Sequence, residues 1–229
     1  MPPGPVPPVR FAWLARLIGA GLAVYLNLVV RTCRVIGPAT RDQVVLAFWH
    51  EFNMLVFLVA RKRRGELPHA SFSTSGFRGA VITSMLKRSG TPIRVFELPP
   101  EEDRAAGRAL AMRMARVAQS GASLIVTPDG PFGPYRIAKP GALILARESG
   151  LPVQPWGMTL RPAIRLSGRW DHQLVPLPFC RIRVVEGSRM SIRPREPIRG
   201  LVTTVETELN RISGPTPVTM TPVPPLQRP

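Results

Sequence analysis

Two polar residues stand directly after predicted buried strands, where the side chains of an α/β sheet can do chemistry. His50 follows the continuous apolar run at 44–49, and Asp129 comes two residues after the run at 123–127. The carboxyl ends of parallel strands meet at one edge of a sheet, which is where ligand sites collect. A histidine held rigidly there could act as a general base, because its ordinary pKa lies near neutrality. The alternative is a structural histidine that satisfies backbone groups at a helix start.

A catalytic histidine usually has a carboxylate that orients its ring. Glu51 is the next residue, but neighbours at i+1 on a helix do not face each other. The residues one helical turn later, 53–55, include no acid. We therefore expect the partner carboxylate to come from elsewhere in the chain, with Asp129 as the best-placed candidate.

The loop that contains Asp129 reads PDGPFGP, and it is either a stiff surface turn or a ligand-binding loop. Pro-Asp-Gly is ordinary turn chemistry, which favours the first reading. Arg136 and Lys139, however, come just before a predicted helix at 140–150. Backbone N–H groups at a helix N-terminus attract anions, and two nearby cations would strengthen that attraction. The pattern is therefore also consistent with an anion site.

Strand and helix patterns alternate from residue 44 onward. The expected strands are 44–49, 70–75, 92–98, 123–127 and 151–160, and the segment 163–196 is strand-rich and irregular. The expected helices are 51–60, 79–90, 101–121, 140–150 and 199–213. This alternation predicts an α/β fold, a single αβα domain with a mostly parallel central sheet.

An apolar stretch at 11–31 precedes this domain. Its uninterrupted part is shorter than the roughly 20 residues that a transmembrane helix needs. Arg10 and Arg16 give it the look of a signal sequence, without a convincing cleavage site. We interpret it as a helix in the membrane interface that leaves the domain on the cytoplasmic side, with an ordinary buried first helix as the alternative. The expected organisation is a flexible leader (1–10), a membrane-associating helix (11–37), an α/β domain (40–213) and a disordered Pro-rich tail (214–229).

The composition is strongly basic, with 31 Lys+Arg against 14 Asp+Glu and a net charge of +17. Such an excess favours polyanionic partners, either an anionic membrane surface or nucleic acid. We find no nucleic-acid-binding motif and few aromatic residues among the basic ones, so specific nucleic-acid binding is the weaker alternative. Cys33 and Cys180 lie far apart, which predicts free thiols in a reducing compartment. No metal-binding spacing is present in the sequence.

Four motifs follow one another along the chain: His50 at a strand end, TPDGPFGP, KPGALILARESGLPVQPWGM and RWDHQLVPLPF. In this order they resemble the lysophospholipid acyltransferase superfamily, and within it the bacterial DUF374-like branch. The resemblance covers roughly residues 40–195 and depends on the order of the motifs, because each motif alone is weak.

The resemblance implies a glycerolipid acyltransferase-like fold and transfer of a fatty acyl group to a hydroxyl of a lipid or lipid precursor. The acyl donor would be acyl-CoA or acyl carrier protein, with no further cofactor. His50 would deprotonate the hydroxyl, which then attacks the thioester. The Pro128-Asp129-Gly130 loop would bind the acceptor, often through a phosphate. We expect a monomer at the cytoplasmic face of the bacterial inner membrane, peripheral or N-terminally anchored, with anionic lipids as partners.

Three positions depart from the family's pattern. In the strand at 92–98, Phe96 stands where an arginine is expected, and Arg94 is close but out of register. Leu55 stands where the superfamily places the acid of its His-x-x-x-x-Asp motif, and Phe132 stands where the branch has an arginine. Losing that arginine would weaken the binding of a phosphorylated acceptor. Three explanations follow: the acceptor carries no phosphate, the chain is a catalytically degenerate lipid-binding relative, or another cation substitutes, namely Arg78, Arg136 or Lys139.

Overall fold

The computed structural model describes residues 11–38, 40–65, 67–100 and 102–214. The expected leader, 1–10, and residues 215–229 of the expected tail lie outside these ranges. The described chain is an α/β fold around a seven-stranded sheet of order β1-β7-β6-β2-β5-β3-β4. The strands are β1 (Arg34–Ile36), β2 (Val45–Ala47), β3 (His69–Ser73), β4 (Ile93–Glu97), β5 (Ser123–Val126), β6 (Val153–Arg165) and β7 (Leu174–Glu186).

The sheet is parallel except for one pair of strands. β2 pairs in parallel with β5 and β6, β3 with β4 and β5, and β1 with β7. β6 and β7 are antiparallel, and both are 13 residues long. The predicted mostly parallel sheet is confirmed, and the irregular segment expected at 163–196 contains one long regular strand. Because β6 runs parallel to β2, the turn from β6 to β7 lies beyond the same sheet edge as the end of β2.

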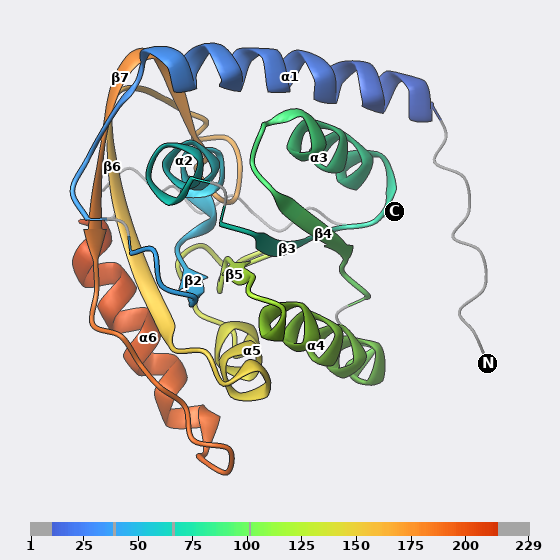
Figure 1. Ribbon diagram of the computed structural model, residues 1–229, viewed down its shortest axis with the longest axis vertical. Helices are drawn as coiled ribbons and strands as arrows, with labels where there is room; N and C mark the ends of the chain where they lie inside the picture. Colours follow the sequence, from blue (N-terminus) through green and yellow to red (C-terminus); the bar gives the residue numbers. More distant parts are fainter. Residues whose placement is uncertain (1–10, 39, 66, 101, 215–229) are drawn as a thin grey trace.

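Helices cover both faces of the sheet (Figure 1). The 3-10 turn η1 (His50–Phe52), α2 (Asn53–Val59), the π-helical turn η2 (Ala60–Arg64) and α3 (Gly76–Arg88) lie on one side, with α1 (Ala12–Thr32) outside them. On the other side are α4 (Arg104–Gln119) and α5 (Gly141–Ser149), and α6 (Ile198–Ser213) lies along β6. Local signals set several of these bounds. Asp103, for example, accepts a 2.9 Å hydrogen bond from the N–H of Ala106 and so caps α4.

α1 is apolar on both its inner and its outer face. Its inner face is buried against α3 and β7 and consists of Ala15, Gly19, Ala23, Leu26 and Val29. Its outer face carries exposed apolar side chains, among them Trp13, Leu17, Val24 and Leu28. By length and composition alone, with a mean hydropathy of 1.7, this helix could cross a membrane, a test that signal sequences and core helices also pass. The predicted segment 11–37 was wrong at its end, because residues 34–36 form β1 and pair with β7.

The tight basic run at 61–64 binds backbone carbonyl oxygens of its own chain. It forms η2, and its first three side chains donate to the carbonyls of Ser89, Cys33 and Val35 respectively. Arg64 is 2% exposed and donates to the carbonyl oxygens of Thr40 and Asp42. The run therefore fastens the segments that follow α1 to the domain.

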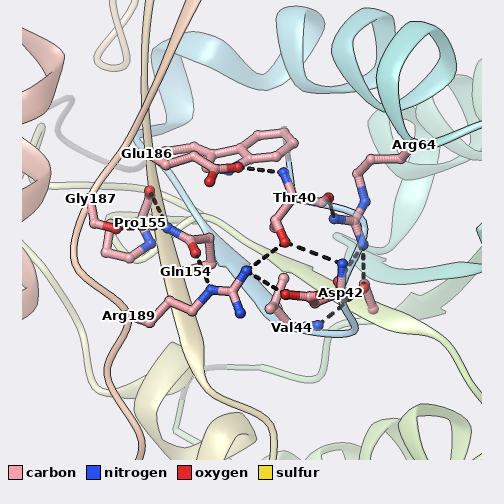
Figure 2. A network of polar contacts seen from close by, with 11 residues as sticks. Thr40, Asp42, Val44, Arg64, Gln154, Pro155, Glu186, Gly187 and Arg189 are labelled. Atoms are coloured by element: carbon pink, nitrogen blue, oxygen red, sulfur yellow. Dashed lines mark hydrogen bonds and ion pairs between the residues drawn. The ribbon is translucent and has the colours of Figure 1, made fainter. Parts of the chain in front are cut away.

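Figure 2 shows the network around Arg64, near the amino ends of β2 and β6. Arg189 donates to Gln154 and pairs with Asp42 at 2.7 Å each. Thr40 N–H donates to the carboxylate of Glu186 at 2.5 Å. These contacts link the segment before β2 to Arg64, to the start of β6 and to the end of β7. They lie at the sheet edge opposite His50, so they stabilise the fold and are not part of the expected site.

Candidate functional site

His50 begins η1, directly beyond the end of β2. Its backbone N–H donates a 3.0 Å hydrogen bond to Oδ1 of Asp129, whose Oδ2 accepts a 3.3 Å bond from the N–H of Arg136. Asp129 is fully buried. The structure thus places Asp129 beside His50, as expected, but the observed bond holds the backbone of His50 and not its ring. Asp129 therefore holds the backbone at His50 and at Arg136 in place.

The imidazole of His50 lies between the loop and the β6–β7 turn. Its Nδ1 is buried and has no hydrogen-bond partner among the residues that the structure describes. The ring of Trp170 packs at a tilt against it, with the two ring centroids 5.0 Å apart. A Cβ atom at Gly130 would lie 2.9 Å from Nδ1, which is closer than real Cβ contacts allow. The histidine is therefore enclosed by two segments that lie about 80 and 120 residues further along the chain.

Burial lowers the pKa of His50 to about 4. The charge of Asp171 acts in the opposite direction, while Arg169 and Arg78 lower the pKa further. Both guanidinium groups therefore lie close enough to act on the imidazole. At neutral pH the ring is uncharged and able to accept a proton.

Two glycines allow the loop to approach these rings. Gly133 has φ +81°, and a Cβ there would lie 2.8 Å from Cε3 of Trp170. Together with the close approach of Gly130 to His50, this explains the glycines of the TPDGPFGP motif through steric contact. Phe132, between them, is 60% exposed.

Glu51 lies at the centre of a buried ionic network. Its Oε1 accepts bonds of 2.8 and 2.6 Å from Nε and Nη2 of Arg136, and its Oε2 accepts a 2.8 Å bond from Arg165. Its backbone oxygen accepts a 3.1 Å bond from Gln173. Glu51 itself is fully buried. Through its carboxylate and its backbone oxygen, Glu51 therefore joins the helix start to the loop and to both arms of the β6–β7 turn.

The last helix also holds the loop. Nη1 of Arg136 donates a 2.9 Å bond to the carbonyl of Gly214, and the N–H of Ala138 donates a 2.7 Å bond to Glu206 of α6. Gly214, expected to begin the tail, thus belongs to the domain. The loop is anchored on one side by Glu51 and on the other by α6.

These contacts correct the role expected for Arg136. Its guanidinium is 6% exposed and bound to Glu51 and Gly214, so it does not face an anion site as predicted. The reason is that the buried carboxylate of Glu51 needs cationic partners. The remaining predicted residues lie as follows: Pro128 is buried and its carbonyl accepts the N–H of Lys139 at 2.8 Å, and Arg78 is exposed near the start of α3.

The sequence of the chain is similar to that of an uncharacterised protein of Rickettsia prowazekii. The two are 28% identical over 149 residues, which is 65% of this chain and 64% of that protein. No protein-family profile and no solved structure matches the chain.

The sequence did not predict three residues of the site, namely Glu51, Trp170 and Asp171. Glu51 could have been found, because a carboxylate inside the apolar segment 44–60 must be buried with a cation. Trp170 and Asp171 were noticed as a motif, but their position beside His50 depends on the β6–β7 turn. Asp171 is fully buried and accepts two 2.8 Å bonds from Arg169.

Replacing Asp129 by Asn should change how stability depends on pH. Burial raises the pKa of Asp129 to about 7 from 3.8, against the backbone N–H bonds that lower it. The folded state therefore favours the protonated acid. The contribution of Asp129 to the free energy of unfolding is fully present below about pH 4 and is lost as the pH rises through 7. Asn does not titrate. As the pH rises from about 4 to 7, the free energy of unfolding of Asp129→Asn should therefore increase relative to that of the wild type by on the order of 3–4 kcal/mol. Urea unfolding of both proteins across this range measures it, and a constant difference in free energy would contradict it.

Proposed function

We propose that the protein is a membrane-associated O-acyltransferase, in which His50 is the general base that activates a hydroxyl of a lipid or lipid precursor. The acyl group would come from acyl-CoA or acyl carrier protein. The observation that carries the proposal is the position of His50, which lies beyond a parallel strand with an uncharged imidazole packed on Gly130 of the TPDGPFGP loop. A neutral imidazole held there suits proton abstraction from a hydroxyl, which is the step such a transfer needs.

Cationic charge near His50 also supports the proposal. Arg78 is exposed, and its charge acts on the imidazole. Arg169 acts on it as well, although it is paired with Asp171. Of the cations considered from the sequence, Arg78 is therefore the one we assign to an anionic group of the substrate, since Arg136 is bound to Glu51.

The assay that tests this function uses the purified wild-type protein and a labelled acyl donor. The donors would be acyl-CoA and acyl carrier protein, and the acceptors a panel of lysophospholipids and glycolipid precursors. We expect transfer of label to at least one acceptor. Absence of transfer with every pair, under conditions in which a related enzyme is active, would contradict the proposal.

The second candidate is a lipid-binding relative that keeps the fold without the chemistry. It is favoured by the inward position of Arg136 and by the exposed ring of Phe132 in place of a cation. Such a protein would bind acyl chains and transfer none. Acyl transfer that depends on His50 would exclude it.

The outer face of α1 is the surface that we assign to the membrane. Trp13, Leu17, Val24 and Leu28 are 51–69% exposed on one side of the helix, and Arg16 and Arg31 are exposed on the same helix. An apolar stripe with basic residues beside it suits an interfacial helix on anionic lipid. The helix would then lie on the cytoplasmic leaflet while its inner face stays packed on α3.

Replacing both Leu17 and Val24 by Asp should reduce the affinity for anionic vesicles by at least about 100-fold, since each buried aliphatic side chain contributes roughly 1.5–3 kcal/mol. Sedimentation with phosphatidylglycerol-containing vesicles measures this affinity. The matched control is Met112→Asp, which changes an exposed apolar residue of α4 on the opposite layer and should leave binding unchanged. Equal binding by the double variant and wild type would show that another surface meets the lipid.

A further inference from the structure

Cys33 and Cys180 are brought together by the pairing of β1 with β7. In the register of these parallel strands, Arg34 lies opposite Arg181 and Val35 opposite Ile182. One step towards the N-terminus places Cys33 opposite Cys180. The residues at 34 and 181 are exposed and those at 35 and 182 are buried, so the alternation of strand side chains puts both thiols on the buried side. The two cysteines are 3% and 0% exposed.

This arrangement fits the geometry of a disulfide. Neighbouring strands lie about 4.7–4.9 Å apart, within the roughly 4.4–6.8 Å that separate the Cα atoms of bridged cysteines. Each thiol lies close enough to the other to shift its pKa. A bridge between them therefore needs rotation of two side chains and little movement of the backbone.

The two thiols differ in reactivity. The hydrogen bond from Cys180 and the charge of Lys62 lower the pKa of Cys33 to about 7, although burial raises it. Lys62 lies beside it, with Nζ donating a 2.5 Å bond to the carbonyl of Cys33. The pKa of Cys180 is raised by its bond to Cys33 and by burial. Because the thiolate is the nucleophile, Cys33 would react first.

We propose that Cys33 and Cys180 are an oxidisable dithiol that forms an intrachain disulfide with a low-molecular-weight disulfide such as oxidised glutathione. The Cys33 thiolate attacks one sulfur of the oxidant, forming a mixed disulfide and releasing one glutathione thiolate. Cys180 then attacks the Cys33 sulfur, gives up its proton and releases the second glutathione. Two electrons pass from the protein thiols to the oxidant, and both protons end on the released thiols.

The bridge would fasten the end of α1 to the sheet. Cys33 directly follows α1, and its N–H donates a 2.7 Å bond to the carbonyl of Val29 in the last turn. The oxidant reaches the buried thiol when the end of α1 opens locally, which breaks the bonds that Lys62 and Arg63 make to Cys33 and Val35. Oxidation would then close that route and hold α1 against β7. This inference does not depend on the proposed acyl transfer.

The test oxidises the reduced, full-length protein with oxidised glutathione and follows it by intact mass and by mapping of disulfide-linked peptides. We expect loss of both free thiols, a link between the peptides that contain residues 33 and 180, and no retained glutathione. The Cys180→Ser variant should instead keep one glutathione on Cys33, and the Cys33→Ser variant should stay largely unmodified.

A second measurement separates this bridge from modification of unfolded chains. The oxidised wild type should melt roughly 10 °C higher than the reduced form, because the bridge closes a long loop, and neither serine variant should show the rise. The proposal would be overturned if the folded protein keeps both thiols while a urea-unfolded sample loses them. Separate glutathione adducts on the two cysteines, without a link, would overturn it equally.

Discussion

Replacing His50 by Ala should lower acyl transfer by about 100- to 10,000-fold, the usual contribution of a general base. The imidazole is uncharged at neutral pH, packs against Gly130 and Trp170, and has no hydrogen-bond partner for its Nδ1 among the described residues. The measurement is the initial rate of label transfer to whichever acceptor the wild type uses. Full activity in this variant would remove His50 from the mechanism.

The matched control is His69→Gln. His69 is also buried, with a pKa lowered to about 4 by burial, but it begins β3 at the opposite sheet edge. Its Nε2 accepts a 3.0 Å bond from Arg64, which a glutamine oxygen can also accept. We expect the rate of acyl transfer by this variant to stay within about threefold of the wild-type rate. A general base accelerates the reaction only if it lies within reach of the reacting hydroxyl. A loss equal to that of His50→Ala would indicate a general effect of removing a buried histidine.

The pH dependence of the reaction gives an independent check on the base. Since burial lowers the pKa of His50 to about 4, the neutral base is present throughout the range in which an ordinary histidine would become charged. The ratio kcat/KM reports the free enzyme. Its acid limb should therefore fall near pH 4 and not near 6.5.

Replacing Glu51 by Ala should destabilise the protein by about 3–5 kcal/mol. The substitution leaves the guanidinium of Arg136, 6% exposed, without the carboxylate that neutralises it, and removes the bond from Arg165. A buried charge that loses its partner keeps its desolvation cost, which is why the effect is much larger than that of a surface pair. The free energy of unfolding in urea measures it.

Two further variants make this prediction specific. Glu148→Ala removes a carboxylate from a half-exposed pair, 3.5 Å from Arg147, and should cost less than about 1 kcal/mol. Combining Glu51→Ala with Arg136→Ala removes both buried charges, so the double variant should cost clearly less than the sum of the two single changes. Simple additivity of the two costs would show that the pair is not coupled.

The sequence was most informative where local periodicity decides the structure. The predicted helix at 101–121, for example, corresponds to α4 (Arg104–Gln119), because capping and glycine signals act within a few residues. The placement of His50 and Asp129 beyond adjacent strands also followed from the α/β pattern. β2 and β5 do pair, which brings the two residues into contact.

Side-chain direction could not be predicted in the same way. Arg136 looked like a surface cation beside a helix N-terminus, yet it turns inward to Glu51, which is 85 residues away in sequence. That choice depends on which carboxylate the fold buries, and no local pattern reports it. Likewise, Trp170 reaches His50 only because β6 and β7 form a long antiparallel pair.

The bond between Arg136 and Gly214 has a consequence for the biosynthesis of the protein. Gly214 is added to the chain 78 residues after Arg136. At about 5–20 residues per second, translation takes roughly 4–16 s to cover that distance. During this interval the loop beside His50 exists without the contact that α6 and its last residue provide. The nascent chain can therefore form its sheet before it can complete the site.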